Sequence, residues 1–244
     1  ARLAVALQGV SIAERATQKA LAFAAERRQG KAPGWEAEGM SPIIEHPDVK
    51  RMLATMRAST LASRAICYML AAEIDRAHLG RTPEERKAGH ARASLLTTIA
   101  KAYSTDIGNE VASLGVQVHG GMGFVEETGA AQHMRDARIY AIYEGTNGIQ
   151  AIDLVTRKIG IEGGALVAAE IARMRGIVAD VAKSNAVEFG LTAARLRETV
   201  DALETATKHL LGALANDPAN AQAGATPYTR LFGLALGGTA LAQK

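Results

Sequence analysis

The sequence predicts an all-α fold, an antiparallel helical bundle followed by a smaller helical extension. Hydrophobic residues make up 48% of the 244 residues but aromatic residues only 4%, so the apolar content is mostly Ala, Leu, Val and Ile, which favours packed helices. Only six prolines occur, which leaves room for long uninterrupted helices. Apolar residues recur at helical spacing, whereas the alternation typical of strands is absent over any useful length.

The first expected helix carries Leu3, Leu7 and Val10 at helical spacing and ends where glycine and proline appear in RRQGKAPG. A loop over residues 29–46 follows, and loops of such length are usually functional. Pro47 opens the second helix, because proline is favoured in a first helical turn. In order, helices are expected over residues 3–28, 47–78, 82–119, 130–138, 146–159, 165–185, 190–215 and 227–244.

The third helix begins with a capping signature, in which Thr82 is the cap, Pro83 opens the helix and Glu85 is its third residue. It ends near His119 in the glycine-rich stretch HGGMGFVEETG, which predicts a loop. A short helix follows, and the next begins near Thr146 or Asn147.

The glycine-rich segment GIEGG at residues 160–164 breaks the chain, and three Ala/Leu-rich helices follow it. The segment ANDPANAQAGATP at 215–227 is expected to be the linker before the last of them. We therefore expect two domains, a helical bundle over residues 1–161 and an additional, truncated helical domain over residues 162–244.

Charge and composition exclude several classes of protein. The 28 Lys and Arg are interleaved with 25 Asp and Glu, which is typical of an ordinary solvated surface, so nucleic acid is not an expected partner. No apolar stretch is long enough for a transmembrane helix, and no membrane partner is expected. The single cysteine, Cys67, lies in an apolar helix face, which suits a buried thiol and a cytoplasmic location. No metal ligands are assigned.

Both ends suggest a piece of a longer protein. The chain starts with Ala1 rather than Met, without the basic segment of a signal peptide. It ends at Lys244 within a helical pattern.

The stretch IYAIYEGTNGIQ, residues 139–150, places a lone carboxylate, Glu144, between an apolar segment and a glycine-bracketed helix start. A partly desolvated carboxylate near a helix N-terminus is suited to general base catalysis. Gly145 and Gly148 allow the backbone to approach a flat ligand or an oxygen closely. The alternative is structural, with Glu144 as an ordinary first-turn acid of the helix.

A second stretch, GVQVHGGMGF at residues 115–124, ends a helix in Gly-Gly-x-Gly. Backbone N–H groups exposed at such an end suit a phosphate or the edge of a cofactor ring. A glycine-rich loop alone is weak evidence. The two stretches in this order, about ten residues apart, form a specific combination.

These motifs resemble the C-terminal half of the acyl-CoA dehydrogenases. That family carries Q-x-x-G-G-x-G, then RD-A-(K/R)-I, then I-Y-E-G-T-x-x-I-Q, and the chain matches them at residues 117–123, 134–139 and 142–150. The resemblance extends from residue 1 to about 160. One branch of the family resembles the chain most closely in two stretches, PIIEHPDVKRMLATMRA and EGTNGIQAIDLV. This branch comprises the larger bacterial enzymes with an extra helical C-terminal domain, and it includes 3-methylmercaptopropionyl-CoA dehydrogenase.

The resemblance implies an FAD-dependent enzyme of fatty acid metabolism that desaturates an acyl-CoA thioester between its α and β carbons. Glu144 would remove the α-proton while a hydride leaves the β-carbon for the flavin. Some branches place the base just before the arginine that matches Arg2, but Ala1 occupies that position here. Arg2 and the backbone of Gly145 would contact the substrate.

The resemblance also implies which residues contact FAD. They are Arg27, His46, Gln117, Val118, His119, Gly120, Gly121, Thr146 and Asn147. The chain departs from the family after Arg27, where the aromatic residue of E-R-x-x-F-G is missing and a Gly/Pro-rich insertion follows. For His46 the structural alternative is a capping or surface residue at a helix start.

In the resembled family, FAD and acyl-CoA lie between this bundle and two earlier domains, so the fragment alone is expected to be inactive and to bind FAD weakly or not at all. The implied partners are acyl-CoA, an electron-transfer flavoprotein and further copies in a homodimer or homotetramer. The alternative is a dehydrogenase-like flavoprotein with a mainly binding role, in assembly or on DNA. The basic candidates for a DNA-binding face are Arg173, Arg175, Lys183, Arg195, Arg197, Lys208 and Arg230.

Overall fold

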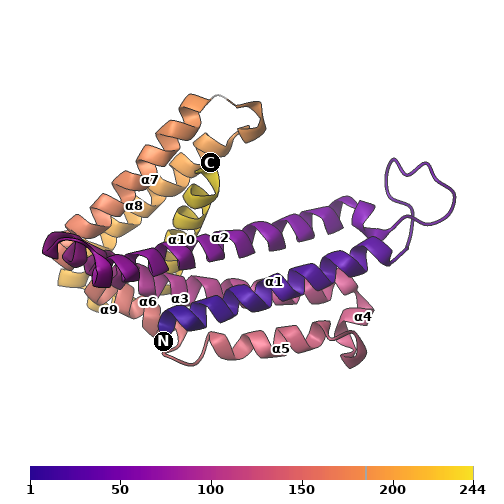
Figure 1. Ribbon diagram of the computed structural model, residues 1–244, viewed down its shortest axis with the longest axis horizontal. Helices are drawn as coiled ribbons and strands as arrows, with labels where there is room; N and C mark the ends of the chain where they lie inside the picture. The colour runs from indigo at the N-terminus through magenta and orange to yellow at the C-terminus, as the bar shows by residue number, and fades with distance from the viewer. Residues whose placement is uncertain (185, 244) are drawn as a thin grey trace.

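The protein is all-α, as the sequence predicts. In a computed structural model, which describes residues 1–184 and 186–243, three long helices pack side by side (Figure 1). They are α1 (Arg2–Glu26), α2 (Pro47–Leu79) and α3 (Pro83–His119). A shorter helix, α5 (Ala130–Tyr140), lies against α1 and α3 and completes the bundle. The short connection between α2 and α3 makes them antiparallel neighbours, which is the arrangement expected of a bundle, whereas α1 and α2 are joined by a long loop.

The predicted start of α3 is confirmed by its cap. The Thr82 hydroxyl oxygen accepts a hydrogen bond from the backbone N–H of Glu85 at 3.1 Å. The Glu85 carboxylate in turn accepts one from the backbone N–H of Arg81 at 2.7 Å. Two backbone donors that the helix cannot satisfy internally are thereby paired.

Helix α1 ends at Glu26, two residues before the expected end. Arg27 is extended, with φ −67° and ψ 121°, and its carbonyl accepts a hydrogen bond from the N–H of Ile43 at 2.7 Å. Further along, Gln29 and Ser41 are joined by a backbone bond of 3.1 Å. The insertion is therefore a closed loop that projects from the end of the bundle (Figure 1), followed by a 3₁₀ turn, η1 (Ile43–Glu45).

Two segments predicted as loops contain helical turns. The glycine-rich segment forms α4 (Gly121–Phe124) and a 3₁₀ turn, η2 (Glu126–Thr128). The expected linker at 215–227 contains α9 (Pro218–Ala223), and the last helix begins earlier than expected, at Ala225. The side chain of Asp217 caps α9 by accepting a bond from the N–H of Asn220 at 3.1 Å, and Pro218 opens the helix, so the local signals favoured a helix there.

The helix expected over 146–159 changes character along its length. It begins as α6 (Asn147–Asp153) and continues as a π-helical turn, η3 (Leu154–Lys158). The N–H of Ile159 bonds the carbonyl of Leu154, five residues back, at 3.0 Å. A turn with 3₁₀ character, η4 (Ile161–Gly164), follows, and Glu162 and Gly163 within it have positive φ. Turns of the π type occur often at functional sites.

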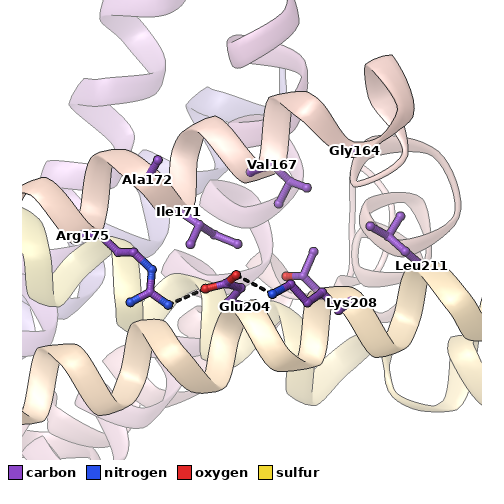
Figure 2. A pocket seen from close by; sticks show the side chains of 10 residues that line it. Gly164, Val167, Ile171, Ala172, Arg175, Glu204, Lys208 and Leu211 are labelled. Carbon is purple, nitrogen blue, oxygen red and sulfur yellow. Dashed lines mark hydrogen bonds and ion pairs between the residues drawn. The ribbon is translucent and has the colours of Figure 1, made fainter.

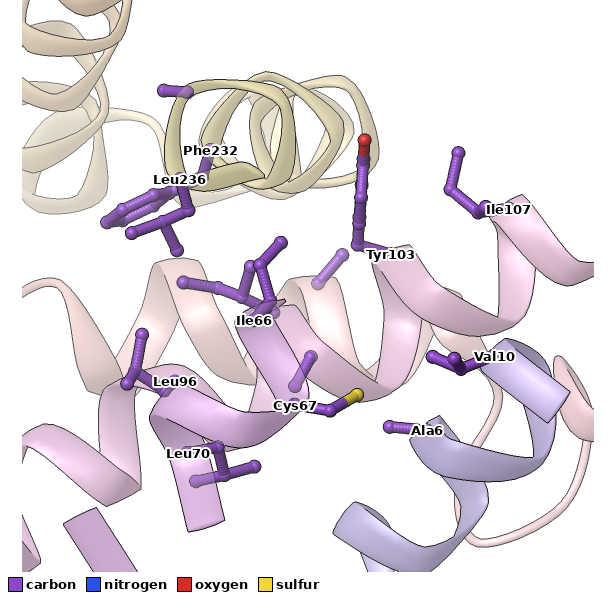
Figure 3. Packing of buried hydrophobic residues seen from close by; sticks show 14 of the residues in the cluster. Ala6, Val10, Ile66, Cys67, Leu70, Leu96, Tyr103, Ile107, Phe232 and Leu236 are labelled. Atoms are coloured by element: carbon purple, nitrogen blue, oxygen red, sulfur yellow. The ribbon is translucent and has the colours of Figure 1, made fainter. Parts of the chain in front are cut away.

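The C-terminal part contains a helix pair and a returning helix. Helices α7 (Ala165–Ser184) and α8 (Thr192–Asn216) pack together, with a 3₁₀ turn, η5 (Val187–Phe189), between them. Helix α10 (Ala225–Ala242) then lies across α2 and α3, where Phe232 and Leu236 approach Ile66 and Tyr103 (Figure 3). The division of the chain at residue 161 stays a prediction, because α10 shares the hydrophobic core of the bundle.

Cys67 is fully buried on α2 and lies 3.5 Å from the hydroxyl of Ser104, which confirms the predicted buried thiol. Burial disfavours the thiolate and raises the pKa of Cys67 to about 11. The thiol therefore has a packing role rather than a reactive one.

Helices α1 and α3 approach each other closely at two glycines. A Cβ atom on Gly9 would lie 2.5 Å from the carbonyl oxygen of Ser104, and Gly108 faces Gly9 from α3. We expect Gly9→Ala to lower the free energy of unfolding by about 1–3 kcal/mol, since the added methyl must separate two packed helices. Urea unfolding measures this loss. The matched control is Gly176→Ala on α7, where a Cβ has no neighbour within 4 Å; an equal loss in both variants would contradict the prediction.

Candidate functional site

The acidic stretch singled out in the sequence forms a tight turn between α5 and α6. Glu144 has φ 57° and Gly145 has φ 84°, so both lie in the left-handed region. A positive φ is uncommon for a residue other than glycine, and in the described ranges Glu144 and Glu162 are the only such residues that have one. The Glu144 side chain is exposed to solvent. The turn therefore presents a carboxylate outward from a strained backbone.

Two buried side chains hold this turn by its carbonyl groups. Gln150 donates a hydrogen bond from Nε2 to the Glu144 carbonyl oxygen at 3.1 Å. Lys101, on α3, donates from Nζ to the Gly145 carbonyl oxygen at 2.7 Å. Thr146 caps α6 by accepting a bond from the N–H of Ile149 at 3.4 Å, in agreement with its predicted position. The carbonyl groups of Glu144 and Gly145 are therefore both held by hydrogen bonds from buried side chains.

Asn147 anchors the turn to α3 through its side-chain amide. Its Nδ2 donates to Asp106 at 2.7 Å and lies close to the Thr105 hydroxyl at 2.9 Å. Its Oδ1 accepts from Lys101 at 3.0 Å. The amide is thus occupied within the protein, so any contact of Asn147 with a cofactor would come from its backbone.

The charges of Lys101, which is buried, and Asp106, which is partly buried, affect one another beneath the turn. Burial raises the pKa of Asp106, and its hydrogen bond from Asn147 opposes that shift. Burial lowers the pKa of Lys101, while the negative charges of Asp106 and Glu144 oppose the shift. Sequence reasoning missed Lys101, Asp106 and Gln150, although Gln150 lies within a matched motif. A lysine within an otherwise apolar run of α3 was the available signal.

Arg2 lies behind the same turn. Its Nη1 donates to Oε1 of Gln150 at 3.0 Å and lies 3.5 Å from the buried carboxylate of Asp153. Arg157 also bonds Asp153, at 2.5 Å. Arg2 therefore orients the amide that holds Glu144, and a substrate contact of Arg2 stays a prediction.

The glycine-rich end of α3 forms a second cluster. Gly120 ends the helix with φ 59° and ψ −141°, a conformation that requires glycine, and a Cβ on Gly120 or Gly121 would have no neighbour within 4 Å. Gln117 is exposed, whereas Val118 and His119 are buried. The His119 ring stacks on Phe23 with centroids 4.4 Å apart and bonds the Gly115 carbonyl through Nδ1 at 2.7 Å.

Arg27 and His46 meet around Gln29 near this end of the bundle. The guanidinium of Arg27 donates to the Gln29 side chain at 2.9 Å. The His46 ring nitrogen Nε2 lies 2.9 Å from the Gln29 carbonyl oxygen. His46 occupies the N-cap position of α2, as the structural alternative expects, but its side chain makes no cap bond and its ring instead closes the inserted loop.

The structure places the predicted site residues at two ends of the bundle. The turn at Glu144 lies beside the N-terminus and α6, whereas α4 and the inserted loop lie at the opposite end (Figure 1). Along α3, Lys101 and His119 are 119 − 101 = 18 residues apart, about 27 Å at ~1.5 Å per residue. The two clusters could not contact the same small group on one copy of the chain.

The C-terminal helices show a separate hollow between α7 and α8 (Figure 2). It has a volume of about 280 Å³, an apolar wall that includes Val167 and Ile171, and ion-paired polar groups at its rim.

Most of the basic residues proposed above for a DNA-binding face are paired with carboxylates. The pairs are Arg173 with Glu170, Arg175 with Asp201 and Glu204, Lys183 with Asp180, Arg195 with Glu198, Lys208 with Glu204, and Arg230 with Glu110. This pairing does not favour a nucleic-acid function. Within residues 1–184 and 186–243, no helix could span a membrane.

A helical bundle with an acidic turn at one end and a glycine-rich helix end at the other belongs to a known class of C-terminal dehydrogenase domains. Residues 1–159 match the family model described as "Acyl-CoA dehydrogenase, C-terminal domain". Residues 168–244 match the model described as "Acetyl-CoA dehydrogenase C-terminal like". The chain belongs to the acyl-CoA dehydrogenase family.

The chain is 44% identical over 234 residues to 3-methylmercaptopropionyl-CoA dehydrogenase of Ruegeria pomeroyi, and the matched region covers 96% of this chain and 39% of that protein. Its fold resembles Caenorhabditis elegans ACDH-11 in complex with C11-CoA, with a TM-score of 0.73 and 20% identity over 100% of this chain and 39% of that one. It also resembles an acyl-CoA dehydrogenase from Bacillus anthracis complexed with FAD, with a TM-score of 0.59 and 22% identity over 98% and 45% of the two chains. The chain thus spans less than half the length of these relatives.

Proposed function

We propose that the chain is the C-terminal part of an FAD-dependent acyl-CoA dehydrogenase in which Glu144 is the base that removes the α-proton of the thioester. The observation that carries the proposal is the turn itself: an exposed carboxylate on a left-handed backbone whose neighbouring carbonyls are each held by a buried side chain. Strained, over-determined backbone of this kind is concentrated at functional sites. The similarity to 3-methylmercaptopropionyl-CoA dehydrogenase supports the reaction class.

Glu144 would act while the substrate lies over the turn. Its carboxylate takes the α-proton and becomes a carboxylic acid, and the electron pair of the broken C–H bond forms the α,β double bond. Bound FAD supplies the acceptor for the hydride that leaves the β-carbon. The backbone N–H of Gly145 would face the thioester carbonyl, where an N–H donor stabilises the negative charge that develops as the proton leaves.

The residues at the two ends fit a bound FAD in different ways. Thr146 and the backbone of Asn147 lie beside the proposed base and would contact the flavin. Gly120 and Gly121 have open surroundings that can admit a ligand close to the backbone. Val118 and His119 are buried in the bundle, so they would contribute main-chain groups.

The separation of about 27 Å along α3 supports a homo-oligomer. In a dimer or tetramer, the turn of one copy would serve one FAD while Gly120, Gln117 and Arg27 of the same copy serve the adenine half of its neighbour's FAD. The proposed partners are therefore an acyl-CoA, further copies of the chain and an electron-transfer flavoprotein that reoxidises the cofactor, in the cytoplasm.

The test is the visible spectrum of the full-length protein that contains this chain. It should purify with bound flavin, and anaerobic addition of one member of an acyl-CoA panel, including 3-methylmercaptopropionyl-CoA and butyryl-CoA, should bleach the flavin band. A flavin that dithionite reduces but no acyl-CoA does would contradict the proposal.

A further inference from the structure

We propose that Lys101 is a positioning residue for the reaction, which holds the Gly145 carbonyl and so aims the carboxylate of Glu144 at the substrate. The inference rests on the proposed function and deepens it, because it names a residue outside the matched motifs. Lys101 comes from the middle of α3, 44 residues before the carbonyl that it bonds.

The burial of Lys101 needs an explanation. Its side chain is completely inaccessible to solvent and is among the largest fully buried side chains of the described residues. Burying an ammonium group is costly unless it is paired and hydrogen-bonded, and lysine is almost never fully buried without such a partner. A methionine has nearly the same length and would fill the space without that cost. The ammonium group is therefore present for its bonds, and these go to Gly145 and Asn147, at 2.7 and 3.0 Å.

The bond from Lys101 acts next to the strained residue. A left-handed conformation is strained for a residue with a side chain, so the turn would relax unless its surroundings fixed it. Gln150 fixes the carbonyl of Glu144, and Lys101 fixes the carbonyl of Gly145. Without Lys101, the Gly145 carbonyl loses its hydrogen bond, so the peptide after Gly145 can shift and move both the carboxylate and the N–H groups that would face the thioester.

The charge of Lys101 contributes as well. Asp106 and Glu144 are the two acids whose charges act on it, and Asp106 lies in the same network through its bond with Asn147. The cation is thus shared between Asp106, a partly buried acid behind the turn, and the exposed acid on it. Lys101, Asn147 and Asp106 together form a hydrogen-bonded network that supports the turn of Glu144.

The experiment uses the full-length flavoprotein with the substitution Lys101→Met, which keeps the length of the side chain and removes its donors. We expect kcat to fall about 10- to 100-fold, since a misplacement of about 1 Å can cost that much. KM should change only a few-fold and the flavin should remain bound. The kinetic isotope effect with α-deuterated substrate should increase, because proton removal becomes more rate-limiting. The matched control is Lys158→Met, which removes a lysine that bonds Ser94 away from the turn and should leave kcat unchanged.

If Lys101→Met does not fold, the double variant Lys101→Met/Asp106→Asn removes the buried cation and the partly buried acid together, and the same fall in kcat is expected. Glu144→Gln is measured beside them. An active Glu144→Gln protein would overturn the proposed function itself. An inactive Glu144→Gln protein, together with a normal kcat and an unchanged isotope effect in the Lys101 variants, would overturn the role of Lys101 alone.

Discussion

Replacing Glu144 by glutamine in the full-length protein is expected to lower turnover by about 10²- to 10⁴-fold while flavin stays bound. This is the range that a positioned general base contributes. Glutamine has the same shape as glutamate and leaves the bonds from Gln150 and Lys101 to the turn in place, so the loss reports the missing base rather than a changed fold. Steady-state kinetics measure turnover, and the visible spectrum measures flavin content.

The chain offers a matched control in Glu162. It is the other residue with a side chain and a positive φ in the described part of the chain, and it is also an exposed glutamate in a turn before a helix. The Glu162→Gln protein should turn over at the normal rate, because Glu162 lies outside the motifs that match the family. Equal losses in both variants would show that the glutamates support the backbone and not the chemistry.

The variant Arg92→Met is expected to lower the free energy of unfolding by about 3–5 kcal/mol, the usual cost of removing one partner of a buried ion pair. Arg92 lies on α3 and bonds Glu170 of α7 through two nitrogens, at 2.8 and 3.0 Å, and Glu73 of α2 at 2.6 Å. All three side chains are buried. The triad therefore joins the C-terminal helices to the bundle, and its loss leaves two buried acids without their shared cation.

Urea unfolding of the chain measures this effect against two controls. Arg51→Met removes an exposed ion pair with Asp48 and should change stability little, since exposed pairs contribute little. The triple variant Arg92→Met/Glu73→Leu/Glu170→Leu removes all three charges and should recover most of the loss. If Arg92→Met is no more costly than Arg51→Met, the triad does not stabilise the contact between the two parts.

The helices were predictable because their signals are local. The Thr82–Glu85 cap and Pro47 mark their own positions, and apolar spacing identifies the buried faces. The same rule identifies α9 from Asp217 and Pro218, although the composition around them resembles a linker. The contact between Gly9 and Gly108 could not be predicted, since nothing in either segment indicates the other.

The candidate site was predictable where a motif is contiguous in sequence. The stretch from Glu144 to Asn147 forms one turn, as its glycines suggested. Its support was not predictable, because Lys101 and Asp106 come from the middle of a distant helix and reach the turn only in the folded chain. The left-handed conformation of Glu144 was also hidden, since such conformations are normally expected at glycine.

The central claim, that the Glu144 carboxylate removes the α-proton, is tested most directly by hydrogen exchange at the substrate α-carbon. The full-length protein is incubated with an acyl-CoA in D₂O, and deuterium at the α-carbon is measured by mass spectrometry. The wild-type protein should incorporate deuterium, and Glu144→Gln should incorporate none above the uncatalysed background while still binding flavin. Exchange by Glu144→Gln at the wild-type rate would contradict the assignment and place the base elsewhere.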